Sequence, residues 1–325
     1  MGSLRPSMVV AVAVWGVWGW FMTSEGLWSL FRTEWGMSAT MMLGSFIAGA
    51  TSEGGGAVAF PVMTLLFGIQ PAVARDFALM IQAVGMTAAA VLIVTRRVKV
   101  EWRAIGWSGL GGAVGIVVGL THAAQLVPPA HAKVFFTSLW LAFAFALYLV
   151  NRNRGRDVAE GMGILRRRDH VMLLVVGAVG GLVSSITGSG LDIITFSLLV
   201  LAFGVSERVG TPTSVVLMAL NAVVGFAWKQ GALGGMEVEA FRYWYVCIPV
   251  VVVGAPLGAW FITDRSRLFV AAILYTSIGI QFIVALIVIP QTVSLLVTSI
   301  ATFTVGALAF RTMGRLGEAR VRDTR

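Results

Sequence analysis

The chain is poor in charged residues, in cysteine and in histidine. Only 12% of its 325 residues are charged, whereas 58% are hydrophobic; soluble domains carry about 25% charged residues. A large soluble helical core would need polar helix faces, which this sequence does not offer, so the composition predicts a polytopic membrane protein. The single Cys247 excludes an intrachain disulfide and a cysteine metal cluster, and the three histidines lack ligand spacing. We therefore expect no metal and no cofactor.

The net charge of +9 lies mainly in loops and does not indicate nucleic acid binding. Residues 151–170 hold six arginines against three acids, and residues 311–325 hold five against two. Basic loops remain on the cytoplasmic side of a membrane. This pattern predicts a bacterial inner-membrane protein with both termini in the cytoplasm.

Two polar, glycine-bearing breaks interrupt the apolar runs. The first is Thr51-Ser-Glu-Gly-Gly-Gly56 and the second is Ile186-Thr-Gly-Ser-Gly-Leu-Asp192. The arms of the first are about fifteen and a dozen residues, or roughly 20 Å of helix each, which is short of the ~30 Å hydrocarbon core. Backbone that leaves the helix at this depth is tolerated only against protein or a water-filled cavity. We expect re-entrant helix–break–helix hairpins over 38–68 and 171–204, with tips that meet near the midplane.

The two halves of the chain are related. An offset of 139 residues pairs short matching motifs, and the hairpins align at an offset of 134. Each half has three crossings if the hairpins are re-entrant, or five if all four arms cross. Either number is odd, which makes the repeats inverted, with the first hairpin entering from outside and the second from the cytoplasm. The matches are Gln82-Ala-Val with Asn221-Ala-Val, Trp102-Arg with Phe241-Arg, Gly115 and Gly119 with Gly254 and Gly258, and Thr137-Ser with Thr276-Ser.

The predicted fold is an all-α polytopic membrane protein with inverted-topology repeats, about eight transmembrane helices and two re-entrant hairpins. The predicted segments are an N-terminal transmembrane helix in 1–33, repeat 1 in 38–150, a basic cytoplasmic linker in 151–169, repeat 2 in 170–289, a C-terminal transmembrane helix in 290–310 and a basic cytoplasmic tail in 311–325.

The breaks also suggest chemistry. The second arm of each hairpin begins at glycines, so its N-terminus presents backbone N–H groups and the positive end of a helix dipole. Packing explains the glycines but not the hydroxyl groups clustered with them, so two such ends facing each other predict a site for a small oxyanion. The predicted substrate-binding residues are Thr51, Ser52, Glu53, Gly54, Gly55, Gly56, Arg75, Gln82, Thr187, Gly188, Ser189, Gly190, Thr213 and Asn221.

Carboxylates inside or beside the spans are candidates for ion coupling, because an unpaired charge in a membrane is costly. They are Glu53, Asp76 and Asp192. Glu53 either carries a coupling proton or caps the following half-helix, and both readings stay open. Arg75 and Asp76 either contact substrate or form an interfacial ion pair. Lys229 ends a span and is interpreted as a snorkelling or loop group.

The motifs resemble a known family. The run Ala48-Gly-Ala-Thr-Ser-Glu-Gly-Gly-Gly56, then Phe60-Pro61 and Gly68-Ile-Gln-Pro-Ala-Val-Ala74, resembles the repeat of the sulfite exporter TauE/SafE family, also called the toluene sulfonate uptake permease family. A second copy, Gly181 to Asp192 followed by Gly204 and Gly210-Thr-Pro-Thr-Ser214, is similar to its second half. The resemblance covers about residues 38–290.

This resemblance implies a secondary transporter of small sulfur-containing anions such as sulfite, sulfonates or sulfoacetate. Glu53 stands where the family often has a small or apolar residue. The second break has Gly188-Ser-Gly in place of three glycines, and no proline matches Pro61. These departures bear on the substrate more than on the fold.

The expected function is therefore transport of a small sulfur oxyanion by alternating access. No ATP-binding loop of the form G-x-x-x-x-G-K-[ST] is present, so ion or substrate gradients would drive it, and proton and sodium coupling both stay open. The alternatives are a channel-like pore for small anions or weak acids, and a non-transport sensor or intramembrane enzyme. The sequence does not favour an enzyme, because neither a nucleophile–base pair nor an H-E-x-x-H motif is visible in it. The expected partners are the anion and the lipid bilayer, with a homodimer left open.

Overall fold

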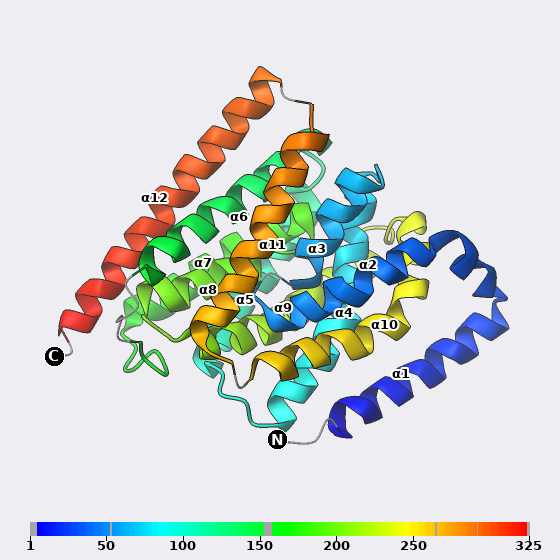
Figure 1. Cartoon of the computed structure of the whole chain (residues 1–325), viewed down its shortest axis with the longest axis horizontal. Coiled ribbons are helices and arrows are strands. Elements are labelled where there is room, and N and C mark those ends of the chain that lie inside the picture. The colour runs from blue at the N-terminus through cyan, green and yellow to red at the C-terminus, as the bar shows by residue number, and fades with distance from the viewer. Residues whose placement is uncertain (1–4, 53, 153–157, 264, 291, 324–325) are drawn as a thin grey trace.

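The computed structural model describes residues 5–52, 54–152, 158–263, 265–290 and 292–323, and this part of the chain is helical throughout apart from its loops and one isolated β-bridge. Figure 1 shows the arrangement. The α-helices are α1 (Arg5–Ser24), α2 (Leu30–Ala50), α3 (Gly54–Pro61), α4 (Pro71–Thr95), α5 (Trp102–Val118), α6 (Pro129–Asn151), α7 (Arg167–Thr187), α8 (Leu191–Ser197), α9 (Glu207–Ala232), α10 (Val238–Ile262), α11 (Arg267–Val288) and α12 (Val293–Asp323). A 3₁₀ turn, η1 (Leu27–Ser29), precedes α2, and π-helical turns η2 (Val62–Leu66), η3 (Gly119–Ala123) and η4 (Leu198–Ala202) follow α3, α5 and α8.

The described residues contain nine helices long and apolar enough to cross a membrane, where the sequence predicts about eight. The additional one is α7, which we expected to be a short hairpin arm and which has 21 residues. Helix α2 also has 21 residues, because it begins at Leu30 and not at Ser38. The expectation missed its first eight residues, Leu30 to Met37, among which Glu34 pairs with Arg242 at 2.8 Å.

Each hairpin therefore joins a full-length arm to a short return arm. A helix of 21 residues is about 32 Å long, enough to cross the hydrocarbon core, whereas the returns over 54–66 and 191–202 are roughly 20 Å. In the first hairpin, the arms lie antiparallel, since Gly44 faces Val58 and Gly36 faces Phe67. Only the return arms are too short to span.

The two halves follow the same order of elements. A break is followed by a short helix, a π-helical turn, a glycine with positive φ and a long helix. The glycines are Gly68 (φ 67°) and Gly204 (φ 65°), and the backbone bonds after them match, with Ile69 N donating to Met63 O and Val205 N to Leu199 O, both at 2.9 Å. These pairs differ by 136 residues. The offset of 134 expected for the hairpins is therefore corrected to 136 in this region.

The halves also exchange packing partners. Helix α5 of the first half lies against α7 of the second, and α10 of the second half lies against α2 of the first. Gly115 meets the backbone of Ala178, and Gly258 meets the backbone of Phe46, so closely that a Cβ at either glycine would overlap a carbonyl oxygen. Small residues permit such close helix contact in membranes. The exchange of partners is what two interlocked, inverted halves produce.

The two breaks lie at different depths, and their tips do not meet at the midplane as expected. Helix α2 runs parallel to α10, so its last residue Ala50 reaches Gly258, near the end of α10. The second break packs instead against the first turns of α4, where Gly188 meets Arg75. Helices α4 and α10 lie side by side, with Gly85 against Val251, which puts the breaks roughly 15 Å or more apart along α4. The full-length first arms carry each tip past the centre.

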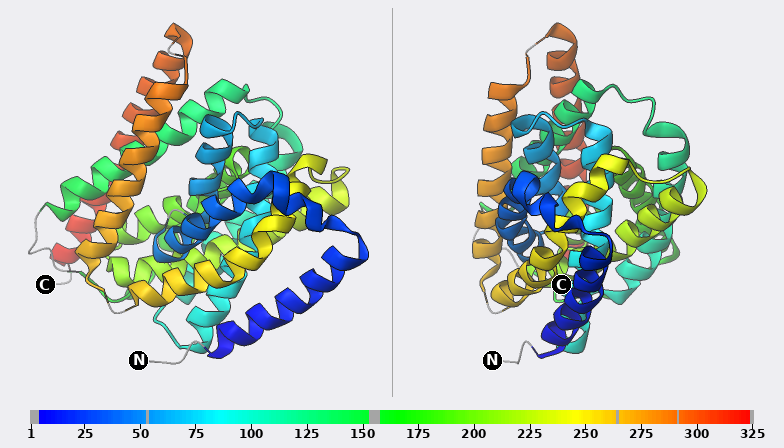
Figure 2. Two further views of the ribbon diagram at one scale, coloured as in Figure 1. Left: turned by 45° about the vertical axis from the view of Figure 1, so that its right-hand side comes forward. Right: turned by 90° about the vertical axis from the view of Figure 1, so that its right-hand side faces the viewer.

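The core lies at the crossing of α4 and α9. In their most apolar windows, 67% of α4 and 78% of α9 are buried, against 17% of α1 and α12. Figures 1 and 2 show α1 on one flank of the molecule and α11 and α12 on the other. Helices α4 and α9 are thus enclosed by protein, whereas α1, α11 and α12 present apolar faces to lipid.

The basic linker marks one end of the molecule, which we call the linker side. There, Lys99 pairs with Glu160 at 2.6 Å, Arg103 donates to Gly163 O at 2.6 Å, and Ala159 N donates to Gly204 O at 2.8 Å. The hydrogen bond and the charge of Lys99 hold the pKa of Glu160 below its usual value. Helix α4 ends at this side and α9 begins there, so the start of α4 and the α9–α10 loop lie at the opposite end, which we call the far side.

The close contact of α5 with α7 can be tested by adding one methyl group. Gly115→Ala places a Cβ on the carbonyl oxygen of Ala178, and we expect it to lower the free energy of unfolding by about 1–3 kcal/mol through overpacking. Gly106→Ala, in the same helix, has nothing within 4 Å and serves as the control. Thermal unfolding in detergent would compare the two; equal stability would contradict the close crossing.

Candidate functional site

The second break is held together by hydrogen bonds within its own chain segment. The carboxylate of Asp192 accepts from Gly190 N at 2.8 Å and from Ser189 Oγ at 3.1 Å. Leu191 N donates to Ser184 Oγ at 3.1 Å, and Thr187 Oγ1 donates to Ser189 O at 2.7 Å. The carboxylate of Asp192 therefore takes up donors at the start of α8 that we expected to face an anion. Asp192 is the second residue of α8, and its carboxylate bonds back to the N–H of Gly190, the residue before the helix, much as the acid of a capping box does.

The first break is described only in part. Thr51 and Ser52 are buried, and Thr51 Oγ1 donates to Ile47 O at 2.9 Å. Within the described part of the chain, the buried Ser52 Oγ has no hydrogen-bond partner. Gly54, Gly55 and Gly56 form the first turn of α3. Glu53 lies outside the described residues, so both readings of it stay predictions.

Two buried amides form a polar layer where α4 and α9 cross. Gln82 Nε2 donates to Gly188 O at 2.8 Å and to Ala78 O at 2.7 Å, which ties the second break to α4. Asn221 lies beside Gly112, which also meets Leu191 at the start of α8. In the described structure, Gln82 Oε1 and Asn221 Oδ1 are buried without partners.

These amides are level with each other in the membrane. Helices α4 and α9 run in opposite directions, and Gly225 of α9 lies against Leu79 of α4. Three residues forward in α4 and four residues back in α9 therefore lead to Gln82 and Asn221 at the same depth. Buried polar atoms normally have partners, and an amide without one is suited to bind a ligand or water. The structure thus brings Gln82, Asn221 and Gly188 into one region.

A charged cluster lies on the far side of this layer. Asp76 is fully buried and accepts four donors. Its Oδ1 accepts from Arg75 Nε at 3.0 Å and NH2 at 2.9 Å, and its Oδ2 accepts from Glu237 N at 2.9 Å and from Lys229 Nζ. We expected Lys229 to snorkel toward water, but it pairs with the buried Asp76. An acid buried within a span requires a cation as its partner. Lys229, at the end of another span, was the sequence signal that could have identified the partner of Asp76.

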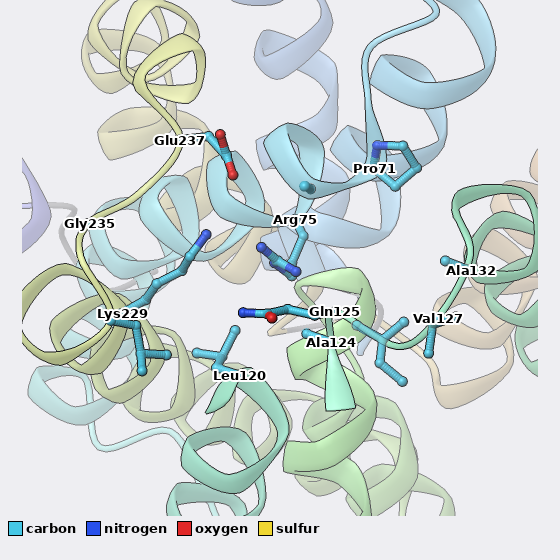
Figure 3. Close-up of a pocket in the computed structure, with 13 residues that line it drawn as sticks. Pro71, Arg75, Leu120, Ala124, Gln125, Val127, Ala132, Lys229, Gly235 and Glu237 are labelled. Carbon is cyan, nitrogen blue, oxygen red and sulfur yellow. The ribbon is translucent and has the colours of Figure 1, made fainter. Parts of the chain in front are cut away.

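A cavity of about 450 Å³ opens beside this cluster (Figure 3). Arg75, Lys229 and Gln125 present their polar ends to it, and the exposed Glu237 lies at its rim. Ile186, the first residue of the second break, also lines it, so the cavity extends to that break. The remaining wall is mostly apolar and includes Pro71, Ala72, Leu120, Ala124, Val127, Ala132 and Leu233. Sequence reasoning found Arg75 but missed Lys229 and Gln125.

Thr213 is not part of this region. Its hydroxyl donates to Val209 O at 2.7 Å and accepts from Glu101 N at 2.9 Å, on the linker side of α9. Both hydrogen-bonding functions of the hydroxyl are therefore in use. The structure gathers Arg75, Gln82, Gly188 and Asn221 on the way from the far side to the centre, and it leaves Thr213 and the first break on the other side of the centre.

The cap formed by Asp192 leads to a stability prediction. Asp192→Ala removes the acceptor for Gly190 N and Ser189 Oγ, and we expect it to lower the free energy of unfolding by about 1–2 kcal/mol. Asp192→Asn keeps one carbonyl oxygen as acceptor and should lose less. Thermal unfolding in detergent would measure both. Full stability of Asp192→Ala would show that the carboxylate does not hold the break.

Comparison with known proteins agrees with this architecture. Residues 37–286, which include both hairpins and exclude α1 and α12, match the model of the family described as Sulfite exporter TauE/SafE. No curated protein and no solved structure was found to match the chain. Because the match covers well over half of the chain, the protein belongs to the sulfite exporter TauE/SafE family of membrane transporters.

Proposed function

We propose that the protein is a secondary transporter that moves a small sulfur-containing oxyanion, such as sulfite, a sulfonate or sulfoacetate, across the cytoplasmic membrane by alternating access. The observation that carries this proposal is the far-side cavity, in which two cations lie beside a buried helix break. Broken helices at membrane depth are where transporters bind their substrates.

The donors follow a path for the anion. Arg75 and Lys229 meet it in the cavity, where burial strengthens their attraction. The next polar groups toward the centre are Gln82, which holds the second break, and Asn221 at the same depth on α9. An amide that has no partner in its present state has capacity left for a substrate oxygen or for a water that accompanies it.

The packing of the two halves supports alternating access. Since α5 packs on α7 and α10 on α2, a movement of one half against the other changes both ends of the molecule together. In the present state, the described cavity lies on the far side, and on the linker side the α4–α5 loop is bonded to Thr213. This arrangement corresponds to a state that receives substrate from the far side.

We place the linker side in the cytoplasm, because its loops and the last part of α12 are rich in arginine. Both termini then lie in the cytoplasm. Helix α1 runs antiparallel to α10, with Trp15 bonded to Pro249 O and Trp18 to Tyr245 O, so it starts near the linker side. Glu53, Asp76 and Asp192 remain our candidates for ion coupling.

The test is uptake of sulfite and of isethionate into proteoliposomes that hold the purified protein. We expect saturable uptake that Gln82→Leu lowers at least tenfold, because this change removes the central amide and frees Gly188 O. Gln281→Leu is the matched control, since Gln281 on the peripheral α11 also has an unpartnered buried oxygen but lies outside the site.

Three outcomes would contradict the proposal. Equal uptake by the Gln82→Leu protein and its control would place the site elsewhere. Uptake that does not saturate would favour a channel-like pore. Failure of the parent protein to move any sulfur oxyanion would exclude the proposed substrate class.

A further inference from the structure

Two loops are bound to the long central helices in equivalent ways. On the far side, Glu237, the residue before α10, donates its backbone N–H to Asp76 of α4 at 2.9 Å. On the linker side, Glu101, the residue before α5, donates its backbone N–H to Thr213 Oγ1 of α9 at 2.9 Å. The donors are 136 residues apart, as are the starts of α4 and α9 and of α5 and α10, and the acceptors are 137 apart, within one residue of that spacing. Asp76 and Thr213 therefore hold matching positions in the two halves.

The two positions differ in charge. Thr213 is neutral, whereas Asp76 is an anion that also binds Arg75 and Lys229. A neutral acceptor is thus sufficient to hold such a loop, and the loop does not explain the two cations gathered on Asp76. Two cations and one carboxylate leave this cluster with a single net positive charge on the cavity wall.

The cluster keeps donors for a ligand. A guanidinium has five N–H groups and an ammonium three, and Asp76 uses two of those on Arg75 and one on Lys229. The side chains of Arg75 and Lys229 are 9% and 12% exposed, so water weakens their charge little. The other acid at the cavity is Glu237, whose exposed carboxylate lies at the rim (Figure 3).

We propose that Arg75 and Lys229 together bind one singly charged oxyanion on the far side, and that Asp76 is a positioning residue that sets the charge this site accepts. For the choice of a sulfur oxyanion, the proposal rests on the proposed function. One negative charge in the ligand balances the cluster. A doubly charged ligand leaves an uncompensated negative charge in a buried place, which is costly.

The shape of the cavity agrees with an organic monoanion. Its volume of about 450 Å³ is much larger than a bare oxyanion requires, and Leu120, Val127 and Leu233 are among the apolar residues that line it. A sulfonate carries one charge at any pH near neutrality and has a carbon substituent for this apolar wall. The site therefore fits a small sulfonate better than a sulfate or sulfite dianion.

The test is equilibrium binding of methanesulfonate, a permanent monoanion, and of sulfate, a dianion, to the purified full-length protein by calorimetry. We expect the parent protein to prefer methanesulfonate at least tenfold. Asp76→Asn raises the net charge of the cluster by one, and its preference should move at least tenfold toward sulfate. Lys229→Gln should weaken methanesulfonate binding at least tenfold, whereas Lys229→Arg, which keeps the charge, should largely restore it.

Two further variants separate charge from structure. The double variant Asp76→Asn with Lys229→Gln has the net charge of the parent, and its preference should return toward methanesulfonate. Thr213→Val removes the equivalent loop bond on the linker side without a change of charge, and its preference should equal that of the parent.

An unchanged preference in Asp76→Asn, or a loss of preference in Thr213→Val as large as in Asp76→Asn, would overturn the proposal. If Asp76→Asn does not fold, the two Lys229 variants decide. The proposal is overturned if Lys229→Gln does not weaken methanesulfonate binding, or if Lys229→Arg does not restore it. If the protein binds both probes but transports no sulfur oxyanion, the proposed function is contradicted. The preference for methanesulfonate over sulfate would still decide whether this inference holds.

Discussion

The structure depends on one constraint, which is that backbone polar groups inside a membrane need partners within the protein. Among the residues that the structure describes, two helices stop at that depth, at Ala50 and at Thr187. At the second stop, side chains satisfy the freed groups, with Asp192 and Ser184 accepting from the backbone and Gln82 donating to it. The same constraint explains why the second break packs against α4, one of the two most buried spans, and not against lipid.

Glycine makes this burial feasible. The contacts of α5 with α7 and of α10 with α2 bring backbone against backbone at Gly115 and Gly258, so each hairpin is pressed into the opposite half of the molecule. Each hairpin is part of one half of the sequence but packs against the other half. This arrangement couples the two ends of the protein. This coupling is what alternating access requires of a symmetric scaffold.

The halves share a backbone plan but differ in charge. The matched residues Asp76 and Thr213 each hold a loop by one backbone N–H, yet only Asp76 gathers cations. The fold therefore supplies two equivalent ends, and a few side chains give the far end the cations on which the proposed anion site rests. A buried carboxylate between two cations also avoids the cost of placing two unpaired positive charges in the membrane.

The sequence by itself determined the class of protein, the two breaks, the related halves and the family, because long apolar runs and glycine motifs are local signals. It also identified Arg75, Gln82 and Asn221 as polar residues inside spans. Only the tertiary structure decided how deep the breaks reach, since that depth depends on the helices against which each arm packs, as where Glu34 near the start of α2 pairs with Arg242, 208 residues away. It alone decided the roles of Lys229 and Asp192. A side chain's direction depends on which partner the fold brings within a few ångströms, and the spacing of residues along the chain does not contain that information.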